Sequence, residues 1–157
     1  MEYFIVEHGV MWDTILEILE RKAKEGVEVR FMYDGMCSIA LLPYHYPKIL
    51  EAKGIHCHAF APIKPALSTY QNNRDHRKIV VIDGHTAFTG GVNLADEYIN
   101  VKERFGYWKD VAVMIKGEAV KNFTIMFLQM WNIWEKTPLD YEKYLSHDLP
   151  QQIEGRR

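Results

Sequence analysis

The sequence predicts an α/β domain in which a mixed β-sheet is flanked by helices. Strand-like segments at about 3–6, 27–32 and 55–60 alternate with helix-like segments at about 10–25 and 44–53. Alternation of this kind predicts parallel strands joined by right-handed crossovers. A β-hairpin pattern later in the chain adds antiparallel strands, so the sheet should be mixed.

Helical periodicity supports the flanking helices. The first helix should begin after Gly9 and end at Gly26, and its apolar residues follow the helical repeat: Trp12, Ile15, Leu16, Leu19 and Ala23. The longest helix should span about 118–134, with an apolar face typical of a core helix. Before it we expect a short helix at about 94–101 and a buried strand at 106–115.

A tight β-hairpin is predicted where the β-branched run 79–82 ends at Asp83 and Gly84 and strand-like residues resume. If these two residues form the centre of the turn, the register places Lys78 opposite Thr89. The hairpin follows a proline-containing segment at 61–73, which we expect to be a loop.

Chemically capable side chains gather at the open end of this hairpin. His76 and Lys78 should project from one face of the strand, while Arg77 points to the other. Asn93 has the same parity and can join them. Gly90-Gly91 should return beside His76, forming a floor on which a ligand can approach the backbone. The sequence therefore predicts a cradle for an anionic group.

Asp83 should lie far from this cradle. Seven strand residues at roughly 3.3 Å each put it on the order of 23 Å from His76. We therefore expect Asp83 to shape the turn and to influence the site only through the backbone.

These residues form a pattern, H-x-K-x4-D-x6-G-[GS]-x-N, through His76, Lys78, Asp83, Gly90, Gly91 and Asn93. The pattern resembles the motif of the phospholipase D superfamily. Flanking segments such as EGVEVRFMYDG and FTGGVNLADEYIN resemble more narrowly the first catalytic half of bacterial cardiolipin synthases, and the likeness reaches about Trp134. It implies a phospholipase D-like half-domain at 1–136 with one motif copy, and a linker or tail at 137–157 toward a missing second half.

The pattern suits phosphoryl transfer. A neutral imidazole can attack phosphorus and form a covalent phosphohistidine, so His76 is a candidate nucleophile. Lys78 and Asn93 would hold the non-bridging phosphate oxygens. A second imidazole is needed to protonate the leaving group. The resemblance implies that it comes from a second motif, in the other half of the parent chain or in a second protomer. Either histidine could be nucleophile or acid.

An acidic residue would fix the tautomer of the His76 imidazole. Asp110 is the first candidate, because the resembling family often has an acidic residue in such a position, and Glu103 is the alternative. This chemistry needs no cofactor and no metal ion. The His-Cys-His run at 56–58 lacks the paired spacings of structural zinc sites, so we interpret it as part of a strand.

The resemblance implies that the parent enzyme transfers a phosphatidyl group from one phosphatidylglycerol to another, giving cardiolipin and glycerol. The phospholipid substrate and the parent's place in the bacterial cytoplasmic membrane follow from the same likeness. Two alternatives remain open. One is another phosphodiester activity, such as lipid hydrolysis, phosphatidylserine synthesis or a dimeric nuclease. The other is an inactive half-domain that only binds its partner half.

Composition limits these possibilities. The formal net charge of −2 over 157 residues provides no global field for nucleic acid, so no nucleic-acid partner is expected. Two cysteines, Cys37 and Cys57, suggest reduced thiols and not a disulfide framework. No apolar run reaches the length of a membrane span. We expect the fragment itself to be soluble and, because it opens directly on a strand, to be cut from a longer chain.

Overall fold

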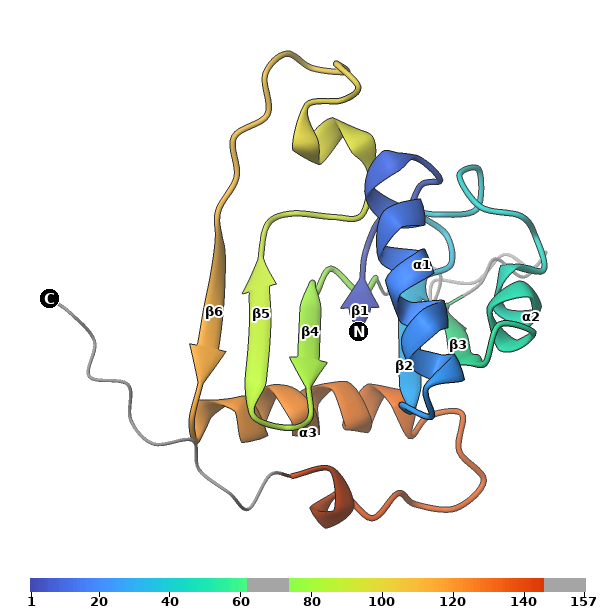
Figure 1. Ribbon diagram of the computed structural model, residues 1–157, viewed down its shortest axis with the longest axis vertical. Coiled ribbons are helices and arrows are strands. Elements are labelled where there is room, and N and C mark those ends of the chain that lie inside the picture. The colour runs from blue at the N-terminus through green and yellow to red at the C-terminus, as the bar shows by residue number, and fades with distance from the viewer. Residues whose placement is uncertain (62–73, 146–157) are drawn as a thin grey trace, which may run out of the picture.

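A mixed sheet of six strands forms the centre of the described chain (Figure 1). The structure, a computed structural model, describes residues 1–61 and 74–145. The strands lie in the order β3-β2-β1-β4-β5-β6; the first three are mutually parallel and the last three antiparallel. This confirms the predicted α/β class. The bounds are β1 Glu2–Tyr3, β2 Val29–Asp34, β3 Ile55–Phe60, β4 Ile79–Ile82, β5 Thr86–Gly90 and β6 Ala112–Lys116.

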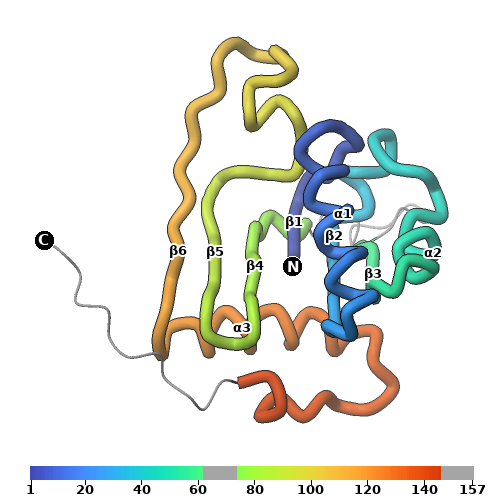
Figure 2. Tube along the Cα trace, viewed as in Figure 1, coloured from blue at the N-terminus to red at the C-terminus, as the bar shows by residue number. Residues whose placement is uncertain are grey.

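Helices cover both faces of the sheet. α1 (Val10–Lys24) and α2 (Tyr46–Glu51) pack on the β1–β3 half, and α3 (Ala119–Trp131) passes behind the β4–β5 turn (Figure 1). Two short 3-10 helices, η2 (Asp96–Ile99) and η3 (Glu142–Tyr144), complete the described elements. Figure 2 shows that the chain between β5 and β6 rises above the upper edge of the sheet.

Side chains of β2 alternate between two apolar clusters. Phe31 stacks on Trp12 of α1 with ring centroids 4.7 Å apart, and the Trp12 Nε1 donates a hydrogen bond of 2.6 Å to the Tyr46 hydroxyl. Met32, next along the strand, packs on the opposite face against Trp131 and its neighbours in α3. The alternation follows from the period of two in a strand, and it joins both layers of helices to the sheet.

Two expectations about the later part of the chain need correction or extension. The strand predicted at 106–115 begins only at Ala112 and is largely exposed, because β6 lies at the edge of the sheet. Part of the segment predicted to be a linker or tail packs on the domain: the Tyr144 hydroxyl accepts a hydrogen bond of 2.7 Å from Arg30. The loop predicted at 61–73 falls, beyond its first residue, outside the described residues.

The predicted hairpin turn is confirmed. Asp83 and Gly84 are its central residues, with φ of 52° and 68°, and the His85 amide donates to the Ile82 carbonyl across the turn at 3.1 Å. Two successive positive φ angles match the twist of a tight hairpin. The turn lies at the lower end of β4 (Figure 1), so Asp83 is at the far end of that strand from Lys78, as predicted.

The predicted hairpin register is wrong by one residue. Thr89 pairs with Ile79, not with Lys78. The reason lies beside the turn, where His85 is accommodated as an extra residue before the strands pair. Lys78 and the residues before it therefore form an extended segment that leads into β4 without belonging to it.

Replacement of Asp83 by alanine should lower the free energy of unfolding by about 1 kcal/mol, because a left-handed backbone is unfavourable for alanine. Asp83→Asn is the matched control, since asparagine tolerates this conformation. Urea unfolding of the two variants measures the difference. Equal stability would show that the turn does not depend on the residue at this position.

Candidate active site

The residues predicted to form the site lie at one edge of the sheet. His76 and Lys78 precede β4, Asn93 follows β5, and Asp110 precedes β6. Because β4 and β6 run opposite to β5, these positions all lie at the upper edge in Figure 1. Phe4, which follows β1, lies there as well. The topology of the sheet thus brings together side chains that are distant in sequence.

His76 and Lys78 face each other, as predicted. The Lys78 Nζ lies 3.2 Å from the His76 Nε2 and donates a hydrogen bond of 2.8 Å to the His76 carbonyl. An ammonium only donates hydrogen bonds, so it can bond Nε2 in the tautomer that carries the imidazole proton on Nδ1. The structure thus brings an imidazole nitrogen and a buried ammonium side by side.

The aromatic ring of Phe4 closes one side of this pair. Its centroid is 4.6 Å from that of His76, edge to face, and the Lys78 Nζ lies 5.2 Å above it. Lys78 is only 5% exposed. Desolvation lowers the pKa of Lys78, and the nearby Asp110 and Asp75 carboxylates oppose that shift. A partly desolvated cation of this kind favours an incoming anion as its partner.

Asn93 is buried and bonded on both sides of its carboxamide. Its Oδ1 accepts a hydrogen bond of 3.1 Å from the Ile5 amide, and its Nδ2 donates to the Tyr98 hydroxyl at 2.9 Å. These bonds fix the carboxamide between the segment after β1 and η2. The second Nδ2 hydrogen is not used by these two bonds, and Asn93 is 3% exposed.

Asp110 lies beside the glycines and Lys78, not on the His76 imidazole. Its Oδ2 accepts a hydrogen bond of 3.1 Å from Trp108, and its Oδ1 accepts one of 2.7 Å from the Val111 amide. Among the described residues it has no hydrogen bond with His76. Its influence on the site is electrostatic, through Lys78. The alternative candidate, Glu103, is exposed.

The two glycines are required by close chain packing. A Cβ on Gly91 would collide with the Asp110 carboxylate, and one on Gly90 would collide with the Val111 carbonyl and Ala112. The space expected to form a floor for a ligand is therefore filled by the segment that leads into β6. The glycines contribute to the site by admitting Asp110.

Arg77 points away from His76, as predicted, and enters a buried acidic pair. Its Nη2 lies 2.7 Å from Glu2, and its Nε lies 2.9 Å from Asp75. Glu2 is fully buried. Burial raises the pKa of Glu2, and the neighbouring Asp75 carboxyl raises it further. The network joins β1 to the residues on both sides of His76.

Asp34, at the end of β2, fixes the segment that carries His76. Its Oδ2 accepts a hydrogen bond of 3.2 Å from the Asp75 amide, while its Oδ1 accepts bonds from Met36 and Cys37 at 3.0 and 2.9 Å. Sequence reasoning missed Asp34, Asp75 and Phe4. Two signals were available in the sequence. Asp34 is an acidic residue at the carboxyl end of a buried strand, and Asp75 immediately precedes the motif histidine.

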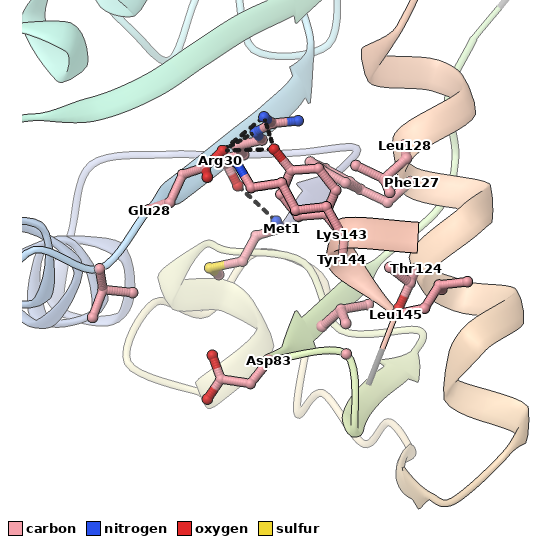
Figure 3. Close-up of a pocket in the computed structure, with 13 residues that line it drawn as sticks. Met1, Glu28, Arg30, Asp83, Thr124, Phe127, Leu128, Lys143, Tyr144 and Leu145 are labelled. Atoms are coloured by element: carbon pink, nitrogen blue, oxygen red, sulfur yellow. Dashed lines mark hydrogen bonds and ion pairs between the residues drawn. The ribbon is translucent and has the colours of Figure 1, made fainter. Parts of the chain in front are cut away.

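His76 lines an open cleft of about 520 Å³ together with Phe60, Arg74, Asp75, Arg77 and Met130, whereas Lys78, Asn93 and Asp110 do not line it. A second hollow of about 490 Å³ lies at the opposite end of the sheet, beside α3 and η3 (Figure 3). Of the predicted site residues only Asp83 lines it, and Figure 3 shows its carboxylate apart from the cluster around Arg30. The two hollows are separate.

In the strand at 55–60, His58 is packed against aromatic rings, whereas His56 is exposed. His58 stacks on Trp134 at 4.9 Å, and Cys37 and Cys57 are free thiols. In residues 1–61 and 74–145, no group of three or more His, Cys, Asp or Glu side chains is placed to hold a metal ion. No helix in these ranges has the length and apolar character needed to span a membrane.

The fold and site define an α/β domain with a histidine–lysine pair at the edge of a mixed sheet. A family model described as "Cardiolipin synthase, PLD-like domain" matches residues 2–131. The chain belongs to this family, as its resemblance to the first catalytic half of these enzymes indicated.

Curated relatives agree with this membership. An "Uncharacterized protein" of Streptococcus mutans is 61% identical over 142 residues, which cover 90% of this chain and 30% of that protein. The "Cardiolipin synthase" of Alkalihalophilus pseudofirmus is 42% identical and that of Geobacillus thermodenitrificans 41%, each over 150 residues, or 95% of this chain and 30% of the relative. The chain thus spans about a third of the length of these relatives.

The buried Glu2 predicts a specific pH dependence of stability. Because its pKa is raised on folding, its contribution is fully present below the ordinary value of 4.5 and is lost as pH rises toward the folded pKa. Glutamine does not titrate. The stability of Glu2→Gln relative to the parent chain should therefore increase as pH rises from about 5 to about 8.

Urea unfolding at several pH values measures this difference. The exposed Glu118 supplies the control variant, Glu118→Gln. A Glu2→Gln difference that stays constant with pH would contradict a raised pKa at Glu2.

Proposed function

We propose that this chain is the first catalytic half of an enzyme that transfers a phosphatidyl group between two phosphatidylglycerol molecules, giving cardiolipin and glycerol. Family membership supports this class of reaction. The observation that carries the proposal is the contact of 3.2 Å between Lys78 Nζ and His76 Nε2; His76 also lines an open cleft. It joins a nucleophile and an anion-binding cation in one place.

In the first step, the lone pair of His76 Nε2 attacks the phosphorus of one phosphatidylglycerol. A nitrogen–phosphorus bond forms, and the bond from phosphorus to the glycerol headgroup oxygen breaks. The oxygen leaves as an alkoxide and takes a proton from an acid, which we assign to a histidine of a second motif. Glycerol departs, and the phosphatidyl group stays on His76.

In the second step, a headgroup hydroxyl of another phosphatidylglycerol attacks the same phosphorus. The second histidine, now neutral, accepts the hydroxyl proton, and the nitrogen–phosphorus bond breaks to restore His76. The products are cardiolipin and the free enzyme. Water in place of the second lipid would give hydrolysis, so the site must favour the lipid hydroxyl.

Lys78 and Asn93 would stabilise the charge that grows on the phosphate oxygens. As Nε2 turns to phosphorus, the Lys78 ammonium exchanges its contact with the imidazole for one with a non-bridging oxygen. The remaining Asn93 N–H is a second donor. Asp110, beside Lys78, would limit the desolvation cost of that cation, and Asp83 would act only through the hairpin turn.

The second motif comes from a partner in this scheme. Either the rest of the parent chain or a second protomer would supply the acid histidine, and membrane attachment would belong to the parent. A dimer of this chain, with the same patch facing itself across a two-fold axis, is the simplest arrangement in which the chain alone completes a site.

Replacement of His76 by alanine should lower turnover by at least about a thousandfold, because both steps pass through its Nε2. The assay measures cardiolipin and glycerol from phosphatidylglycerol vesicles, in parallel with hydrolysis of a soluble phosphodiester, both with chelator and over a range of protein concentrations. His56→Ala, at an exposed histidine of β3, is the control. Activity that rises faster than linearly with protein would mean that two copies form the site.

Retained activity in a folded His76→Ala protein would overturn the mechanism. If the folded chain produces only hydrolysis, the phosphodiesterase alternative replaces cardiolipin synthesis. If it has no activity at any concentration, the same comparison is made after adding the segment of the parent that contains the second motif.

Lys78→Met should lower turnover by about a hundredfold or more, since it removes one charged donor from the developing phosphate charge. Lys48→Met, at an exposed lysine, should leave turnover of the soluble phosphodiester unchanged. Equal rates for the two variants would show that Lys78 does not bind the transferring group.

A further inference from the structure

The connection between β2 and α2, residues 35–45, is here termed the apolar loop. It contains no Asp, Glu, Lys or Arg, although these residues make up 25% of the chain. Three large apolar side chains are nevertheless exposed on it: Met36 at 41%, Ile39 at 48% and Tyr44 at 84%. Exposed apolar patches are typical of interaction sites, and Ile39 and Tyr44 line one hollow.

The apolar loop borders a hollow of about 440 Å³. Tyr33 and Leu42 lie buried in its wall, and Ile39 and Tyr44 line its exposed side. No acidic side chain is among the described residues that line it. Among these described lining residues, Lys48 contributes the one permanent positive charge. The surface therefore combines apolar side chains with a cationic margin.

The apolar loop is fixed to the segment that carries His76. Asp34 accepts hydrogen bonds from Met36 and Cys37 at the start of the loop, and from the Asp75 amide next to His76. Ser38, within the loop, accepts a bond of 3.2 Å from the Val6 amide. One buried carboxylate thus holds the loop and the reactive histidine at the same edge of the sheet.

We propose that the apolar loop is a membrane-docking surface, which enters the interfacial zone of an anionic phospholipid bilayer beside the His76 cleft. The inference rests on the proposed function, because a lipid substrate must bring its phosphate to His76 while its acyl chains stay in the bilayer. Tyrosine is favoured at the level of the headgroups, and Lys48 complements their negative charge. The absence of acidic residues from 35 to 50 removes any repulsion there.

Vesicle binding tests the proposal on the chain itself. The probes are vesicles of equal parts phosphatidylglycerol and phosphatidylcholine, and vesicles of phosphatidylcholine alone, separated from free protein by sedimentation. The test variant is Ile39→Ser with Tyr44→Ser. The matched control, Tyr107→Ser with Ile133→Ser, removes the same residue types where they are 85% and 64% exposed.

The apolar-loop double variant should bind the anionic vesicles about tenfold more weakly than the unchanged chain, since two inserted side chains are lost. The control double variant should bind as the unchanged chain does. Lys48→Glu should weaken binding to the anionic vesicles and leave binding to phosphatidylcholine unchanged. Equal binding by the two double variants, or no vesicle binding by the unchanged chain, would overturn the proposal.

Failure of the docking proposal can be distinguished from failure of the proposed function. His76→Ala should bind vesicles normally, because the apolar loop and not the histidine contacts the bilayer. The apolar-loop variants should hydrolyse a soluble phosphodiester as the unchanged chain does, whether that rate is measurable in the chain alone or after the second motif is supplied. Weaker vesicle binding by the apolar-loop double variant alone, together with retained activity in His76→Ala, would support the docking surface and reject the mechanism.

Discussion

The site depends on the buried ion network that connects the first strand to the segment before β4. Arg77 contacts both Glu2 and Asp75, so the residues on both sides of His76 are held in place. His76 is therefore directed to the opposite face, where Lys78 contacts it. Buried charges of this kind persist only when they are paired. Here the pairing fixes the segment that carries His76.

The first strand acts as the support on which the site is built. Beyond β1, Phe4 packs on the imidazole, the Ile5 amide bonds Asn93, and Val6 bridges to Leu94 in the segment after β5. Residues 4–6 thus contact both the segment before β4 and the segment after β5. The arrangement leaves Lys78 poorly solvated and holds its ammonium 3.2 Å from Nε2 of His76.

The sequence predicted the layered fold and the His76–Lys78 pair because both follow from short-range periodicity. Alternation along an extended segment separates Arg77 from its neighbours whatever the tertiary structure. The predicted hairpin register was wrong by one residue, because His85 lies unpaired between the turn and β5. The centre of the turn itself was predicted correctly. The surroundings of Asp110 could not be predicted, since they depend on how closely β6 approaches Gly91, and the exposure of β6 depends on its place in the sheet.

The central claim is that Lys78 holds His76 with an unprotonated Nε2, ready to attack phosphorus. Nitrogen NMR of the labelled chain, at a pH where the imidazole is neutral, reports the tautomer directly. The structure predicts that the proton is on Nδ1, and that Lys78→Met shifts the population toward the Nε2-protonated form. An Nε2-protonated imidazole in the unchanged chain would contradict the assignment of this nitrogen as the nucleophile.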